Sequence, residues 1–327
     1  MSYESFVVEE ELNSSHASSP LSKESDASLR ALKLQQIANQ QRVHLRKKTT
    51  TKLIKLLKRN ALFLYFEPIL CAQTMKITGA SAVLKIQRQG GGLIPAKHIL
   101  LLVEESPILI DIGCWMVGQI LNRTKKFPRQ FVFTLPVSAY LLQSQKFVSY
   151  VVNGLNSLKI GSGRLQFALT DDVICADMGD LDEPLQRLAE AGVTFSLSHH
   201  GTIEQAQQLL DEGDFFTLVL DKYLVKSALE SKERHRKLKA LCKTVHAHNC
   251  TVRVAGAEAT DMINLYSAAG IDELQGSAIA TAVPLNTLLA CCRQSCLVDM
   301  AEIEQPWRQN VTKQMERAPI DEYLRRE

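Results

Sequence analysis

From Ala61 onward the sequence alternates short apolar runs with longer amphipathic stretches, and this alternation restricts the fold more than any other feature. The apolar runs have the length of strands, and the amphipathic stretches repeat apolar residues at helical spacing. Strands are predicted at 62–69, 75–87, 130–136, 165–170, 193–198, 216–221, 251–255 and 272–275. Helices are predicted between them at 95–104, 108–122, 138–158, 182–191, 203–212, 233–248 and 259–269. Strands followed by helices in this way indicate a parallel α/β domain.

Eight strands with helices between them are the number that closes a TIM-like barrel. An open, doubly wound sheet is the alternative, but no G-x-G-x-x-G motif follows the first strand. The three glycines at 90–92 lead toward Pro95 and not into a helix N-terminus, so they indicate a loop and not a phosphate cradle. We therefore predict an α/β fold, a TIM-like (β/α)8 barrel with an N-terminal helical and disordered extension.

Composition divides the chain into four parts. Residues 1–28 are rich in Ser and Glu, which predicts a disordered acidic tail. We assign residues 29–60 to a basic helical segment, 61–290 to the barrel domain and 291–327 to a C-terminal helix and tail. The start MSYESFVVEEEL lacks the pattern of a secretory signal, and no apolar run is long enough for a membrane span. A cytoplasmic location is therefore expected.

The cysteines predict free thiols and no metal centre. The chain has eight of them and no C-x-x-C pair. Cys291, Cys292 and Cys296 lie close in sequence, but their helical spacing beside Leu288 and Leu289 favours buried thiols over metal ligands. Free thiols are also what a reducing compartment maintains.

The segment between Leu29 and Arg59 contains no acidic residue and repeats apolar residues at helical spacing. One interpretation is a helix that covers the main domain and exposes a solvated basic face. The other is a surface for nucleic acid or an acidic partner, although aromatic residues that stack on single-stranded bases are absent. The basic residues of the candidate surface are Arg42, Arg46, Lys47, Lys48, Lys52, Lys55, Lys58 and Arg59.

The predicted strands end on residues that offer few metal ligands. Functional side chains of such barrels lie at the C-terminal strand ends, and a hard divalent cation takes several oxygen ligands, mainly carboxylates. The carboxylates nearby are Asp171, Asp172 and Asp221. The residues at the strand ends are Ser81, Pro136, Ala168, Ser198 with His199, Val219 and Ala255. No metal and no cofactor are therefore expected.

Several segments resemble the motifs of one family in order and spacing. LIKLLKRNALFLYFEPI is similar to an entry helix and a first strand that ends in Q-P-I. LIPAKHILLLVEESPILIDIGCWMV resembles P-x-x-F-I-x-x-A-E-x-x-G-x-I-x-x-I-G-x-W, and VSAYLL resembles N-L-S-x-x-x-L. FSLSHHGTIEQAQQLLDEGDFFTLVLDKYLV follows D-D-F-G-T-G and L-K-I-D-x-x-F-V, while AGAEAT and GIDELQG resemble A-E-G-V-E-T and G-x-D-x-x-Q-G. From about Leu53 to Pro284 the chain thus resembles the EAL domain, a bacterial phosphodiesterase that hydrolyses cyclic di-GMP.

The resemblance implies that most metal-binding residues of the family are replaced here. The glutamate of the E-A-L signature corresponds to Ser81, and the metal-binding asparagine of the third strand corresponds to Pro136. The first acid of the E-I-T-E motif corresponds to Ala168, while its second acid persists as Asp171.

The second half of the barrel shows the same replacement. The paired metal-binding aspartates correspond to Ser198 and His199, the catalytic lysine to Val219, and the glutamate of A-E-G-V-E to Ala255. Zinc takes three or four ligands, and the neighbours of His199 at the barrel mouth supply too few.

A few polar positions persist. Asp221 and Glu258 remain acidic, and Gln275 is the polar site residue retained unchanged. Lys85 stands where the resemblance places a phosphate-binding arginine, and Glu67 replaces the glutamine of Q-P-I. Together, Glu67, Lys85 and Gln275 form a candidate ligand pocket, although the carboxylate of Glu67 disfavours an anionic ligand.

These replacements predict an enzymatically inactive EAL-like regulatory protein. Such a protein acts through protein–protein interaction, in the motility, attachment or biofilm control that the resemblance implies. One alternative is a non-catalytic receptor for cyclic di-GMP, although cyclic di-GMP is not the expected partner. The other is a nucleic-acid-associated regulator that uses the basic segment. A protein partner is expected first, and a homodimer is left open.

Overall fold

The structure is a computed structural model that describes residues 40–41, 43–88, 91–103, 105–169, 173, 180–199, 202–203, 215–258 and 263–293. The chain divides into two units, Met1–Thr49 and Thr50–Glu327. In the first unit, residues 43–49 are helical. The second unit contains all of the strands.

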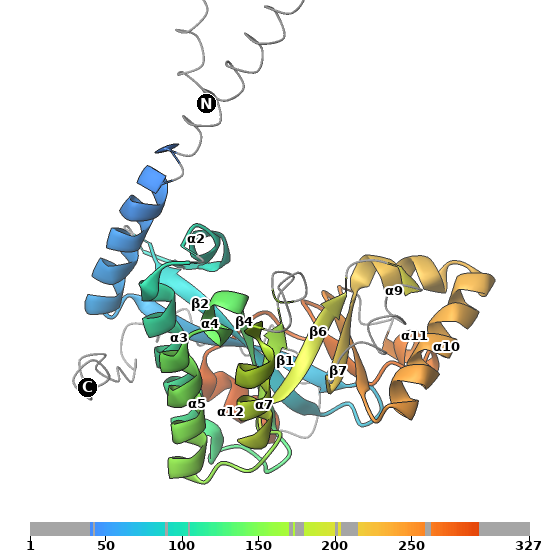
Figure 1. The fold of residues 1–327 in the computed structure, drawn as a ribbon. Helices are drawn as coiled ribbons and strands as arrows, with labels where there is room; N and C mark the ends of the chain where they lie inside the picture. Colours follow the sequence, from blue (N-terminus) through green and yellow to red (C-terminus); the bar gives the residue numbers. More distant parts are fainter. Residues whose placement is uncertain are drawn as a thin grey trace, which may run out of the picture. The chain divides into compact units, whose positions relative to one another are not determined.

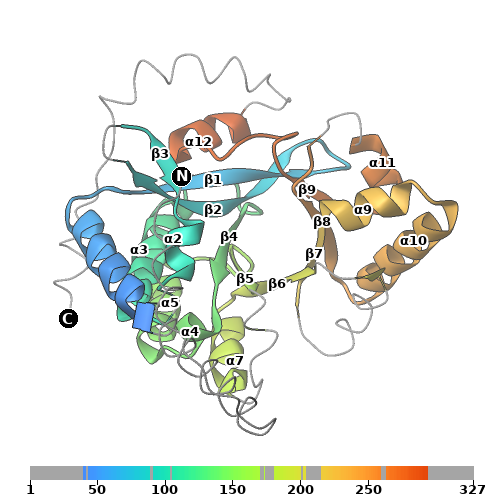
Figure 2. The ribbon, with the colours of Figure 1, turned by 90° about the horizontal axis from the view of Figure 1, so that it is seen from above.

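Eight strands of the second unit close into a barrel, which confirms the predicted fold class. Around the ring each strand pairs with the next, and β1 completes it by pairing with β2 on one side and with β9 on the other (Figures 1 and 2). In ring order the strands are β1 (Leu62–Cys71), β9 (Glu273–Gln275), β8 (Thr251–Ala255), β7 (Thr217–Asp221), β6 (Thr194–His199), β5 (Leu165–Leu169), β4 (Val132–Val137) and β2 (Ile77–Gln87).

The prediction of an all-parallel sheet is wrong for β1. This strand runs antiparallel to both β2 and β9, whereas the other neighbours in the ring are parallel. The reason is the short connection over residues 72–76, because parallel neighbours need a crossover of about a dozen residues or more. A short additional strand, β3 (Leu93–Pro95), pairs with the last residues of β2 and was not predicted.

Helices lie outside the ring. α3 (Pro107–Thr124) and α5 (Gln145–Leu158) lie beside β4 and β5, and α9 (Lys222–Leu229) and α10 (Lys232–Ala247) lie beside β7 and β8 (Figure 2). Among the described residues, no helix is both long enough and apolar enough to span a bilayer. The helices are α2 (Lys97–Leu101), α3 (Pro107–Thr124), α4 (Ala139–Leu142), α5 (Gln145–Leu158), α7 (Asp182–Glu190), α9 (Lys222–Leu229), α10 (Lys232–Ala247), α11 (Ile263–Ala268) and α12 (Leu285–Arg293).

Two helix predictions need correction. The helix predicted at 138–158 is divided into α4 and α5, because Ser144 is extended and its hydroxyl accepts a hydrogen bond from the Phe147 N–H, capping α5. α9 was not predicted; it begins directly after β7, where Asp221 caps it.

The helix predicted at 203–212 lies almost wholly outside the described residues. α12 begins at Leu285, before the boundary predicted for the C-terminal part.

The basic segment contributes to the core of the second unit. Residues 50–58 are helical, and Leu53 and Leu57 on this helix are buried in the same apolar cluster as Ile112 and Phe133. This packing agrees with the interpretation of a helix that covers the barrel domain with its apolar side.

The described cysteines are free thiols. Burial raises the pKa of Cys242 to about 12 and that of Cys114 to about 11. Cys291 and Cys292 lie on α12, and burial together with the neighbouring Cys291 raises the pKa of Cys292 to about 12. Thiols with such pKa values stay protonated near neutral pH and are poor metal ligands and nucleophiles.

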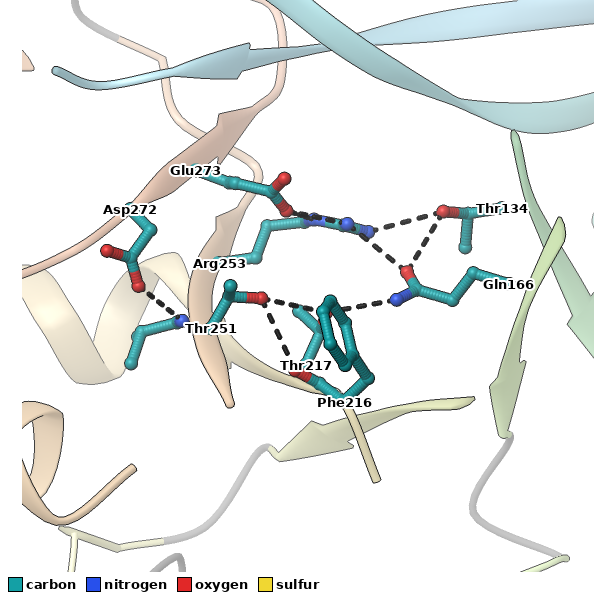
Figure 3. A network of polar contacts seen from close by, with 9 residues as sticks. Thr134, Gln166, Phe216, Thr217, Thr251, Arg253, Asp272 and Glu273 are labelled. Carbon is teal, nitrogen blue, oxygen red and sulfur yellow. Dashed lines mark hydrogen bonds and ion pairs between the residues drawn. The ribbon is translucent and has the colours of Figure 1, made fainter. Parts of the chain in front are cut away.

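A polar network joins side chains from several strands inside the barrel (Figure 3). At its centre the Arg253 guanidinium, 3% exposed, lies 2.7 Å from a carboxylate oxygen of Glu273 on the next strand. Arg253 also donates to the Gln166 side-chain oxygen on β5 at 3.2 Å and to the Thr134 hydroxyl on β4 at 3.5 Å. Since β8 is not a sheet neighbour of β4 or β5, these contacts cross the barrel interior.

The rest of the network satisfies the amide of Gln166. Its side-chain oxygen accepts from the Thr134 hydroxyl at 3.1 Å, and its side-chain nitrogen donates to the Thr217 hydroxyl at 3.0 Å. The hydroxyls of Thr217 and Thr251 are 2.9 Å apart. Five strands are thus joined through side chains that are fully or mostly buried, where unpaired polar groups would be costly.

We expect Arg253→Met to lower the free energy of unfolding by about 3–5 kcal/mol, because it leaves the carboxylate of Glu273 without its cation. The double variant Arg253→Met/Glu273→Leu removes both charges and should recover most of that loss. Urea unfolding followed by circular dichroism measures both values. Equal stability of the single variant and the unmodified chain would show that the ion pair contributes nothing to the barrel.

Candidate functional site at the barrel mouth

The polar network identifies which side chains face the barrel interior. Side chains alternate between the two faces of a strand, so residues two positions further along share the inward face and lie nearer the C-terminal strand ends. Applied to Thr134, Gln166, Thr217, Arg253 and Glu273, this rule gives the residues of the barrel mouth. They are Pro136, Ala168, Val219, Ala255 and Gln275.

The strand register brings the other predicted positions to the same place. Ser81 pairs with both Glu67 and Thr134, and Ser198 pairs with Val219. Asp221 pairs with Ala255, which in turn pairs with Gln275. The predicted strand-end positions therefore line one site, as barrel topology requires. His199 is the last residue of β6, and Asp171 lies outside the described residues.

Few of the described residues at this mouth offer an oxygen ligand for a cation. Pro136 and Ala168 have hydrocarbon side chains, so neither contributes a side-chain ligand. Ser81 and Ser198 are half-buried and present neutral hydroxyls. In the part of the chain that the structure describes, no group of three or more His, Cys, Asp or Glu is placed to hold a metal ion.

The two retained acids at the rim have other partners. The Asp221 carboxylate accepts a hydrogen bond from the Tyr223 N–H at 2.7 Å and caps α9. Glu258, in the loop after β8, forms an ion pair and a hydrogen bond with Lys222, and this hydrogen bond raises the pKa of Lys222. A rim carboxylate engaged in this way is a weaker candidate for a metal ligand than a free one.

The predicted ligand pocket is only partly assembled. The Gln275 amide donates to the Glu67 carboxylate at 2.8 Å, so these two residues meet across β9 and β1. Lys85 instead points its ammonium at the Ala282 carbonyl, 3.3 Å away, and over the ring of Tyr65, 4.1 Å from its centroid. Burial raises the pKa of the Tyr65 hydroxyl, so this ring stays neutral and Lys85 keeps a cation–π contact.

The loops after β8 and β9 fix the backbone of Gln275. The Ala257 N–H donates to the Gln275 carbonyl, and the Ala278 N–H donates to the Ala257 carbonyl, both at 2.9 Å. Gly276 lies between them with φ of +145°, and a Cβ there would come within 2.4 Å of the Ala257 backbone. Only glycine fits this position, so the Q-G turn serves the architecture of the mouth.

The predicted basic surface lies on the helix at 43–58. Lys47, Lys48, Lys52, Lys55 and Lys58 are exposed, as is Arg59 directly after it, and Arg46 is half-buried. Arg42 lies outside the described residues. The sequence prediction missed Tyr65, Lys222 and Arg253, because each owes its role to a partner that is distant in sequence.

The family of the chain follows from comparison with known proteins. Residues 51–282 match the family model described as EAL domain. This match covers well over half of the chain and includes all eight barrel strands. The chain therefore belongs to the EAL domain family.

Individual relatives are distant in sequence. The chain is 21% identical over 224 residues to the signaling protein YkoW of Bacillus subtilis, covering 68% of this chain and 28% of YkoW. It is 22% identical over 230 residues to the cyclic di-GMP phosphodiesterase PdeL of Escherichia coli, covering 69% of this chain and 64% of PdeL. The chain thus spans less than two thirds of the length of either relative.

Solved structures share the fold. The FimX EAL domain of Xanthomonas citri, in complex with cyclic di-GMP, superposes with a TM-score of 0.65 at 16% identity. The match covers 76% of this chain and 97% of that domain. At this level of identity the similarity establishes the barrel, while the chemistry of the site depends on this chain's own residues.

We expect Gly276→Ala to lower the free energy of unfolding by about 2–4 kcal/mol, because the added methyl group meets backbone atoms in a conformation that L-residues rarely adopt. Gly161→Ala is the matched control, since nothing lies within 4 Å of its Cβ position. Thermal unfolding of both variants measures the difference. Two equally stable variants would contradict the close approach of the two loops.

Proposed function

We propose that this member of the EAL domain family is not a phosphodiesterase and acts as a regulatory protein through contact with a protein partner. The processes it would regulate are those that the resemblance implies, namely motility, attachment or biofilm formation. The observation that carries the proposal is the set of inward-facing residues at the mouth, Pro136, Ala168, Val219 and Ala255, none of which carries a charge or a metal-binding oxygen.

Metal-assisted phosphodiester hydrolysis needs cations that polarise the phosphate and lower the pKa of the attacking water. The cations need carboxylates, and the resemblance places the catalytic lysine at Val219, which is buried and aliphatic. The hydroxyls of Ser81 and Ser198 do not replace the carboxylates, because a neutral hydroxyl is a weak ligand for a hard cation. No single substitution in this chain would restore the missing ligands.

Exposed aromatic side chains support contact with a protein. Tyr223 is 69% exposed at the start of α9, directly after the mouth end of β7, and Lys222 lies 4.8 Å from its ring centroid. Phe216, next to the other end of β7, is 48% exposed. Tyr and Phe are enriched in the cores of protein interfaces, so both residues are candidate anchors for a partner.

The proposal predicts no linear product when the purified full chain is incubated with cyclic di-GMP and Mg²⁺ or Mn²⁺. Chromatography of the nucleotides measures the product. PdeL is the positive control, and a reaction that contains a metal chelator gives the background. Product above the chelated background would overturn the proposal.

A non-catalytic receptor for cyclic di-GMP is the second candidate. It is favoured by the cyclic di-GMP complex of the FimX EAL domain, which has the same fold, and by Gln275 at the mouth, whereas the Lys85 ammonium contacts the Ala282 carbonyl. It is disfavoured by Glu67, whose carboxylate would lie near an anionic ligand.

Calorimetry with cyclic di-GMP, with and without Mg²⁺, separates the two candidates. We expect no heat for the unmodified chain. Glu67→Gln keeps a hydrogen-bonding partner for Gln275 and removes the charge, so any residual binding should strengthen about fivefold, the equivalent of about 1 kcal/mol. Saturable heat that disappears in Lys85→Ala would establish the receptor in place of a purely protein-binding role.

A further inference from the structure

α10 exposes a row of positive charges that belongs neither to the mouth nor to the basic segment at 43–58. Its buried side consists of Leu238, Leu241, Cys242 and Val245, which pack against the barrel domain. The opposite side carries exposed Lys232, Arg236, Lys239 and Lys243. These four residues recur at steps of four, three and four positions, which places them on one face of the helix.

The four residues, which we name the α10 stripe, form a straight row of cations. An α-helix rises 1.5 Å per residue, so the α10 stripe extends over about 16 Å with roughly one cation per turn. α10 lies on the outside of the barrel beside α9, as both views show (Figures 1 and 2).

The charges of the α10 stripe are not neutralised within the described part of the chain. There, no ion pair involves Lys232, Arg236, Lys239 or Lys243, and the acidic residue of α10, Glu233, pairs with Lys237 at 4.0 Å. Exposed like charges at one turn's distance repel each other. The row therefore favours a partner that supplies several negative charges in a line.

The surroundings of the α10 stripe distinguish between two classes of partner. Cores of protein interfaces are rich in aromatic and apolar side chains and poor in lysine. The large exposed apolar side chains of the described residues all lie elsewhere, and none is on α10. They are Val43, Leu45, Ile54, Ile94, Leu102, Phe216 and Tyr223.

We propose that the α10 stripe binds the phosphate backbone of double-stranded nucleic acid. Phosphates of a duplex follow one another every few ångströms along each strand, so a row of cations about 16 Å long faces several of them. No aromatic residue lies in the stripe to stack on bases, and contacts to phosphate carry little sequence information. The binding is therefore sequence-tolerant. It involves a surface separate from the mouth and does not depend on whether the mouth hydrolyses cyclic di-GMP.

Fluorescence anisotropy of the full chain with a labelled duplex of about 20 base pairs tests the proposal. Four phosphate contacts predict a fall in affinity of about 100-fold between 50 and 200 mM salt. A variant with Lys232→Glu, Arg236→Glu, Lys239→Glu and Lys243→Glu should lose binding at 50 mM salt. Its buried face is unchanged, and circular dichroism verifies its fold.

The control variant carries Lys47→Glu, Lys48→Glu, Lys52→Glu and Lys55→Glu, with the same number of charge reversals on the helix at 43–58. The proposal predicts that it retains most of the binding. Absence of binding by the unmodified chain at 50 mM salt overturns the proposal, as does unchanged binding by the α10 variant. An equal loss in the control also overturns it. Binding of an acidic polypeptide, polyglutamate, in preference to the duplex would assign the stripe to a protein partner and overturn it as well.

Discussion

The ion pair between Arg253 and Glu273 is the centre of the polar network that joins strands inside the barrel. A guanidinium that is almost fully buried requires an anion and several acceptors, and it finds them on β9, β5 and β4. Arg253 thereby links strands on opposite sides of the ring. Removal of the anion alone would leave this buried charge unpaired, at a cost of several kcal/mol. The charge of Arg253 is thus satisfied by residues other than Pro136, Ala168, Val219 and Ala255 at the mouth.

The barrel fold and the chemistry of its mouth depend on different side chains. The outward faces of the strands pack on the helices through residues such as Phe133 and Leu135. On the inward faces, side chains of the polar network such as Thr134 are joined by hydrogen bonds. The register of the strands places Pro136, Ala168, Val219 and Ala255 at the mouth, and this placement does not depend on what their side chains are. These side chains shape what the mouth can bind, while the network centred on Arg253 is made by other residues.

Strong local signals made much of the fold predictable. β7 and β8 are short runs rich in apolar residues and were predicted to within one residue, and the register of their ends follows from barrel topology. The antiparallel direction of β1 was missed, although the five residues between β1 and β2 are too few for a parallel crossover. α4 and α5 are divided by the cap that Ser144 provides. The helical spacing of apolar residues continues across this serine, so the spacing alone does not reveal the break.

The site was predictable in its positions but not in its contacts. Arg253 lies in the apolar run TVRVA, and nothing local shows that its partners are Glu273, Gln166 and Thr134 on three other strands. The pairing of Glu67 with Gln275 also joins residues 208 positions apart.

The electron paramagnetic resonance spectrum of free Mn²⁺, recorded as the chain is added, tests the central claim about the mouth most directly. We predict that the free-ion signal stays unchanged, and a signal that falls in proportion to added protein would contradict a mouth without metal ligands.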